Sequence, residues 1–198
     1  NAGNSIQSGG NYNTVVGDEA GTAITTGDNN VAVGYQAGDA ITTGSLNTFF
    51  GAAAGSASAT VDSNTAIGAF AFDAGTGADN TAVGSGALGG GSNSAASNVA
   101  VGKDAGNAVT TGASNTLIGS QAGDALLAAA DNVAVGASAL SAETGGQNNV
   151  AIGKNALLVQ VNSSGNIYNT VVGSQAGKAV TTAIRNTLIG GLVGDALT

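Results

Sequence analysis

The sequence contains no cysteine, histidine, methionine, tryptophan or proline, and only 8% of its 198 residues are charged. Without cysteine and histidine the chain has no thiol nucleophile, no imidazole proton shuttle and no zinc-type ligand set. Without cysteine, the redox compartment also cannot be inferred. The twelve carboxylates are scattered singly apart from the pair Asp18-Glu19. We therefore expect no enzyme activity, no cofactor and no metal site, with calcium at most an incidental ion.

Positive charge is also scarce. Twelve acidic residues face four basic ones, so the formal net charge is -8, and nucleic acid and anionic membranes should repel the chain. The longest apolar run, residues 125–130, is too short to cross a bilayer, and the N-terminus has no signal-peptide pattern. We expect no nucleic-acid partner and no membrane insertion, in either a mature chain or an excised fragment.

The chain is instead rich in glycine, with 34 residues, and its apolar residues recur at fixed spacing. The pentad Asn-Thr/Val-apolar-Val/Ile/Phe-Gly occurs eleven times, for example NTVVG at 13, NVAVG at 30 and NTFFG at 47. Successive pentads begin 17, 17, 17, 16, 18, 17, 17, 17, 20 and 17 residues apart. This regularity indicates an internal repeat of about seventeen residues.

The repeat length and the pentad composition predict an all-β fold. Seventeen residues are too few for the helix pairs of helical solenoids, and β-branched pentads bounded by Asn and Gly are typical of strands. We predict a parallel β-solenoid, or β-roll, of about eleven 17-residue coils, which at about 4.8 Å per layer is on the order of 50 Å long. Residues 1–198 would form one repeat domain, with a partial unit at 1–12, full units from 13 to 185 and a truncated unit at 186–198.

The first and last positions of the pentad are invariant. The closing Gly is expected to supply a positive φ or a close backbone approach at a corner. The opening Asn is expected to form a stacked ladder, its amide bonding to the equivalent Asn of the neighbouring coils or capping the turn backbone. The predicted ladder residues are Asn13, Asn30, Asn47, Asn64, Asn80, Asn98, Asn115, Asn132, Asn149, Asn169 and Asn186.

The third position of the pentad is apolar in every copy. Alternate residues of a strand face opposite sides, so the second and fourth positions share one face and the third takes the other. Both faces are then apolar, and because a narrow solenoid has one inside, the second buried face must meet another wall of the same coil or a neighbouring chain. We favour a neighbouring chain, which the third position would face. The predicted inter-chain face is Val15, Ala32, Phe49, Ala66, Ala82, Ala100, Leu117, Ala134, Ala151, Val171 and Leu188.

The remaining positions divide the coils into two variants. The eighth residue is Ala in ten of the eleven units, and the ninth is Gly in seven and a large apolar residue in four, namely Phe72, Leu88, Leu140 and Leu157. The variable second half of the unit resembles a shorter strand followed by a turn. The longer spacing in the ninth unit, around Gln160 to Ile167, predicts a protruding loop.

Thr-Thr pairs occur at 25–26, 42–43, 110–111 and 181–182. They are similar to the threonine arrays of ice-binding solenoids. Only the first two pairs occupy successive coils, so a regular match to an ice lattice is disfavoured. Ice binding, or another surface binding by a monomeric solenoid, stays as an alternative.

The pentads resemble a known family of repeats. N-T/V-A-V/I-G followed by x-x-A is similar to the N-S-V-A-I-G-x-x-S/A repeats in the heads of trimeric autotransporter adhesins. NVAVGYQAG at 30–38 resembles the NTAVGYQAG-type repeats of phage tail fibres and other surface fibres. The adhesin resemblance implies a left-handed β-roll assembled as a homotrimer, although the period of about seventeen exceeds the adhesins' fourteen.

These observations predict a non-enzymatic structural and adhesive module of an extracellular, cell-surface or virion fibre. Its partner would be itself, as a homotrimer or as an end-to-end filament, with outward turns contacting a host surface or glycan. A self-polymerising extracellular filament with a mechanical role only is the second alternative.

Overall fold

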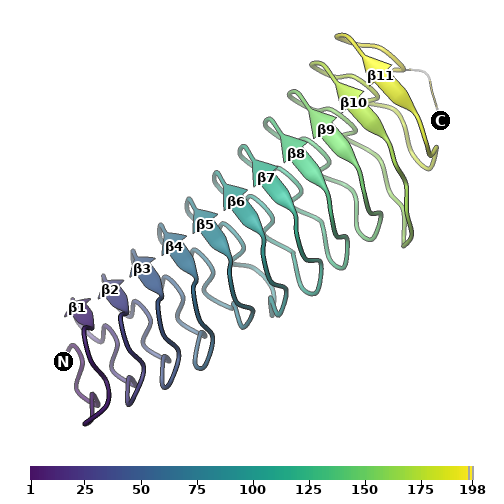
Figure 1. The fold of residues 1–198 in the computed structure, drawn as a ribbon. Coiled ribbons are helices and arrows are strands. Elements are labelled where there is room, and N and C mark those ends of the chain that lie inside the picture. The colour runs from purple at the N-terminus through teal and green to yellow at the C-terminus, as the bar shows by residue number, and fades with distance from the viewer. Residues whose placement is uncertain (196, 198) are drawn as a thin grey trace.

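The computed structural model describes residues 1–195 and 197, and it is a straight rod built from a single winding chain (Figure 1). Eleven three-residue strands stack along the rod in sequence order as one parallel sheet. The predicted all-β parallel solenoid is confirmed. The strands are β1 (Thr14–Val16), β2 (Val31–Val33), β3 (Thr48–Phe50), β4 (Thr65–Ile67), β5 (Thr81–Val83), β6 (Val99–Val101), β7 (Thr116–Ile118), β8 (Val133–Val135), β9 (Val150–Ile152), β10 (Thr170–Val172) and β11 (Thr187–Ile189).

The strands pair strictly in register, so each pentad position forms a row along the rod. Val15 of β1 pairs with Ala32 of β2, which in turn pairs with Phe49 of β3. The register also holds where the spacing changes, as Val150 pairs with Thr170 across the twenty-residue step. Length variation is therefore absorbed outside the sheet, and the rows continue through it.

Each coil contains one strand, not two. The predicted shorter strand in the second half is wrong: among the described residues this half forms turns and bends, with isolated bridges only between Gly75 and Asn93 and between Gln147 and Asn166. Successive coils are still hydrogen-bonded there, as where the Thr25 N–H donates to the Thr42 carbonyl at 2.9 Å. The described residues also include no helix long and apolar enough to cross a membrane.

The glycine that closes each pentad turns the chain away from the sheet. Gly34 has φ +133°, and a Cβ built on it would lie 2.6 Å from the carbonyl oxygen of Gly51 in the next coil. The predicted requirement for glycine at this corner is confirmed by both conformation and space. The seventh and last positions of the unit are also left-handed, but mostly without glycine, as at Gln36 (φ +55°) and Leu46 (φ +62°).

The interior is a single narrow column of side chains. The alanine at the eighth position is fully buried in all ten coils that carry it, because a larger side chain would meet the facing wall. A coil with a large third residue, such as Leu117, has glycine at the ninth position, and a Cβ on Gly123 would lie 2.8 Å from the Leu117 side chain. A coil with a large ninth residue, such as Phe72, has Ala66 at the third. The two coil variants are thus two ways of filling the same volume.

Candidate functional site: the outward face of the sheet

The second and fourth pentad positions point away from the coil interior and form two parallel rows along the rod. None of these twenty-two side chains is buried. The second row holds Thr14, Val31, Thr48, Thr65, Thr81, Val99, Thr116, Val133, Val150, Thr170 and Thr187. The fourth row holds Val16, Val33, Phe50, Ile67, Val83, Val101, Ile118, Val135, Ile152, Val172 and Ile189.

The third-position row lies inside the coil, so our prediction that it faces a neighbouring chain is wrong. Nine of its eleven members are fully buried within the single chain, and the other two, Val15 and Leu188, are partly buried and pack against the core. Consecutive strand residues alternate between faces, so placing the third position inward places the second and fourth outward. The sequence indicated two apolar faces correctly but did not show which one the coil encloses.

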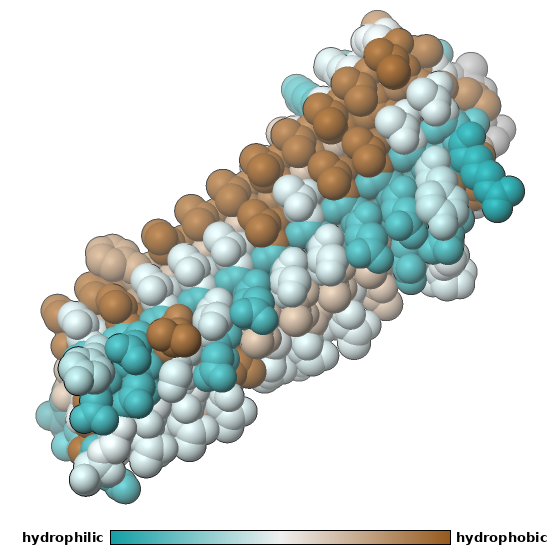
Figure 2. Space-filling view, in the orientation of Figure 1, coloured by the Kyte–Doolittle hydropathy of each residue, from teal (hydrophilic) through white to brown (hydrophobic). Residues whose placement is uncertain are grey.

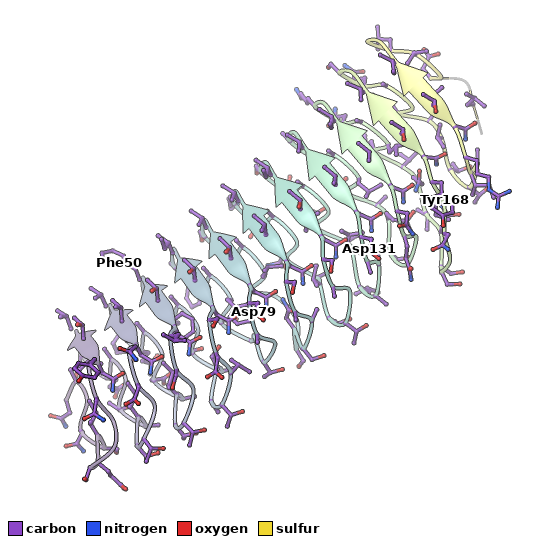
Figure 3. All side chains as sticks on the ribbon, viewed as in Figure 1. Phe50, Asp79, Asp131 and Tyr168 are labelled. Carbon is purple, nitrogen blue, oxygen red and sulfur yellow. The ribbon has the colours of Figure 1, made fainter. Side chains whose placement is uncertain are left out.

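The fourth row forms a hydrophobic stripe, beside a second row of seven threonines and four valines. Figure 2 shows hydrophobic residues lined up along the upper edge of the rod over almost its whole length. In the fourth row, 40% of the Ile118 surface and 54% of the Phe50 surface are exposed. Figure 3 shows Phe50 at the upper edge of the rod, pointing away from β3. A continuous row of exposed apolar side chains of this length marks a contact surface.

A few acidic residues lie on either side of the stripe. Asp79, Asp131 and Tyr168 occupy the position just before the Asn of their coils and lie in one line along the rod (Figure 3). Beyond the glycine corner, the seventh position carries Glu19 and Asp104. Lys103 lies 3.4 Å from Asp104, so these flanks carry both signs, and the repulsion between copies of the chain at long range comes from the net charge of -8 of the whole chain.

The predicted asparagine ladder is confirmed between coils with ordinary spacing. The Oδ1 of Asn115 accepts hydrogen bonds from the backbone N–H of Asn132 at 3.0 Å and from its Nδ2 at 3.2 Å. The same Nδ2 also donates to the Gly146 carbonyl at 3.0 Å. Asn115 and Asn132 are buried, and each amide joins two coils while capping a turn, so the ladder is structural.

The ladder changes partners at the twenty-residue step. There the Asn169 N–H donates to Asn149 Oδ1 at 3.3 Å, while Asn169 Nδ2 donates to Gln160 Oε1 at 2.8 Å. Gln160 Nε2 in turn donates to the buried Glu143 at 2.9 Å. Gln160 thus takes the place of the missing amide contact. Sequence analysis missed this role for Gln160 and Glu143, although two polar residues at the otherwise mostly apolar twelfth position were a visible signal.

Glu143 is fully buried and is held by hydrogen bonds alone. Its Oε1 accepts from the backbone N–H groups of Thr144, Gly145, Gly146 and Asn162, at 2.8 to 3.1 Å. Its Oε2 accepts from the side chains of Gln160 and Asn162. Six donors compensate the cost of burying the carboxylate. This network anchors the base of the insertion.

The insertion protrudes as predicted, between buried ends at Gln160 and Ile167. Residues 161–166 are exposed except for Asn162, and a Cβ on Gly165 would meet nothing within 4 Å. The loop carries Val161, which is 48% exposed, but no set of converging polar side chains. We assign it no ligand.

The Thr-Thr pairs do not form a flat array on the sheet, because they lie on bends of the coil. The first hydroxyl of three pairs is used internally: Thr25, Thr42 and Thr110 each donate to a carbonyl of the following coil, at 3.0, 2.9 and 2.8 Å. The threonines that do form a regular outward row are those of the second pentad position.

The carboxylates provide no metal centre in the part of the chain that the structure describes, where no three acidic side chains converge. Burial raises the pKa of Asp39, Asp73 and Asp124, which share the tenth position of their coils. The Oδ1 atoms of Asp39 and Asp124 are enclosed and have no hydrogen-bond partner. Ionisation of these three carboxylates therefore lowers the stability of the fold. Among the residues that the structure describes, no other chemical group is placed around them in a way that suits catalysis.

No family model, no curated protein and no solved structure matches this chain. The functional argument therefore depends on the geometry of the solenoid and on the repeat motif.

Proposed function

We propose that this chain is a rigid structural and adhesive module of an extracellular or virion fibre, in which copies of the chain assemble through the outward rows of the sheet. The observation that carries the proposal is the pair of outward rows, an apolar fourth row beside a second row of Thr and Val, which runs the length of the rod and is exposed in the single chain.

The dimensions of the stripe suit a protein interface. A stable interface buries about 800 Å² per partner and uses about 20–30 residues a side. The chain exposes 7727 Å² in total, so about a tenth of its surface is sufficient. The twenty-two outward side chains match this number, and Thr, Val and Ile form a nearly flat surface with few flexible groups to immobilise.

A closed homotrimer is the assembly that we favour. Trimeric heads are what the resemblance of the pentads to adhesin repeats implies, and closed symmetry covers the stripe of every copy without leaving one exposed. Coil stacking gives the rod its stiffness, because each coil bonds to its neighbours through the backbone and the Asn ladder. The exposed turns and the loop at 161–166 remain free to contact a surface.

The test uses two adjacent residues of β7 that point in opposite directions. Ile118 is outward and 40% exposed, whereas Leu117 is buried.

Light scattering of the parent chain should give three times 18.5 kDa at every concentration. Ile118→Glu should give a folded monomer, because it places a charge in the interface. Leu117→Glu should abolish cooperative folding, and Ser120→Glu, at an exposed position past the corner, should leave the trimer intact.

The same measurement separates the alternatives. Particles whose mass increases with protein concentration would favour a self-polymerising filament. A concentration-independent monomer of the parent chain would contradict the trimer, and thermal hysteresis of that monomer would favour ice binding through the outward threonine row.

A further inference from the structure

Aromatic residues are few in this chain, and two of them stand out by position. Of its seven, Phe49 and Phe72 fill the coil interior. Tyr35 and Phe70 instead lie just past the glycine corners of the second and fourth coils, and 53% and 55% of their surfaces are exposed. In the other coils the corresponding positions hold mainly small or hydrophilic residues.

The coil between these two rings leaves a shallow floor of alanine. Ala52 and Ala53 occupy the same two positions in the third coil, and neither is buried. The Ala53 N–H donates to the Tyr35 carbonyl at 2.8 Å, and the Phe70 N–H donates to the Ala52 carbonyl at 2.9 Å. The two aromatic residues are therefore two coil layers apart, roughly 10 Å along the rod, on either side of two methyl groups.

The fold does not require an aromatic ring at position 70. Phe70 is in the left-handed region, with φ +57°, which is unfavourable for a bulky residue. The next coil places Gly86 at the equivalent position with φ +69°. The Phe70 ring is mostly in solvent, so it gains little from packing in the monomer. All eleven coils are left-handed at this position, so the exposed ring rather than the backbone sets Phe70 apart, and a contact outside the chain would account for that ring.

The surroundings restrict the chemistry of that contact. Residues 1–102 contain no lysine or arginine. Gln36, the residue after Tyr35, donates from its Nε2 to Glu19 Oε2 at 2.7 Å. Glu19 in turn lies close enough to Asp39 for the two carboxylates to repel each other. This surface provides hydrogen-bond acceptors and repels anions. A compact cation would need rings gathered closely around it, whereas these two are separated by a flat floor.

We propose that Tyr35, Phe70 and the floor of Ala52 and Ala53 form a binding platform for a neutral oligosaccharide. The apolar C–H faces of sugar rings would stack on the two aromatic rings, and their hydroxyls would donate to Glu19. This proposal rests on the adhesive part of the proposed function. The platform lies beyond the corners at Gly34 and Gly68, beside the outward rows, so assembly through those rows leaves it accessible.

The absence of tryptophan allows a specific reporter. In Tyr35→Trp, the single indole should shift its emission in a saturable way on titration with a β-1,4-linked glucose hexamer. Adding Phe70→Gly should weaken binding about tenfold or more, because one of two stacking rings is lost. The thermal midpoint should stay equal or rise, because the strain at position 70 is relieved. Adding Tyr168→Ala, which removes an exposed tyrosine elsewhere on the rod, should leave binding unchanged.

Three outcomes would overturn the platform: no saturable shift at millimolar hexamer, equal affinity with and without Phe70, or preferential binding of an oligogalacturonate or of tetralysine. The mass of each variant by light scattering separates this proposal from the assembly. A trimer that fails to bind the hexamer refutes only the platform, whereas a monomer that binds it refutes only the trimer.

Discussion

Phe49 packs against Gly55 of the same coil so closely that a Cβ at residue 55 would lie 2.5 Å from the ring. Gly55 also has φ +62°, so a side chain there is opposed by conformation as well as by space. Phe49 is fully buried and is one of the two aromatic side chains inside the rod. A large third residue thus requires glycine six positions later, whereas an alanine at the third position is followed by a large residue or by glycine, as in the coils of Ala66 and Ala32.

This relationship predicts a strong coupling between the two positions. Gly55→Ala should destabilise the fold by several kcal/mol, because the methyl group overlaps the ring and φ is unfavourable. Phe49→Ala alone should cost about 3–5 kcal/mol through the cavity it leaves. In the double variant the clash is removed, so urea unfolding should show a loss clearly smaller than the two single losses combined. Simple additivity would contradict the proposed packing.

The asparagine ladder predicts a large cost for a small side chain. Asn115→Ala removes the acceptor for the Asn132 N–H and the donor to the Ala129 carbonyl, both in the buried part of the coil. Each unsatisfied buried group costs about 1–3 kcal/mol, so we expect a loss of about 3 kcal/mol in the free energy of unfolding. Ser120→Ala, at an exposed position nearby, should change it by less than about 0.5 kcal/mol. Equal effects of the two variants would contradict a structural ladder.

The network around Glu143 predicts that a nearly isosteric change is harmful. Glu143→Gln replaces one acceptor oxygen by an NH₂ group. If this group replaces Oε2 it faces the donor Gln160 Nε2, and if it replaces Oε1 it faces the backbone N–H groups. We expect a loss of about 2–3 kcal/mol in the free energy of unfolding, and faster hydrogen exchange in the loop at 161–166. Glu19→Gln, which changes an exposed carboxylate, serves as the matched control. Unchanged stability of Glu143→Gln would show that the loop is anchored in another way.

The raised pKa values of Asp39, Asp73 and Asp124 predict a pH-dependent stability. Burial raises the pKa of Asp124, and the nearby Asp104 raises it further. The folded state then binds the proton more tightly than the unfolded state, so stability falls as pH rises from the ordinary carboxyl pKa through the raised one. Asp124→Asn should increase the thermal midpoint at pH 7, and this gain should vanish below about pH 4. Asp79→Asn, which makes the same change at an exposed position, serves as the matched control.

Much of the architecture could be predicted from the sequence because each structurally required residue recurs at the same position in eleven repeats. The period, the closing glycines and the opening asparagines led directly to the solenoid, the corners and the ladder. The second half of the coil was predicted less well, because its left-handed residues, such as Leu46 and Asp79, are not glycines. Only the backbone conformation reveals why a strand cannot form there.

The sequence by itself determined that this chain is an extended parallel β-solenoid with two apolar strand faces. Only the tertiary structure decided which face is enclosed. Val, Ala and Leu at the third position and Val and Ile at the fourth are similar in hydrophobicity, so composition does not tell inside from outside. The coil decides it, because the narrow interior accepts one central residue from each three-residue strand and leaves the two flanking residues in solvent. The contact surface of the rod follows from that geometry.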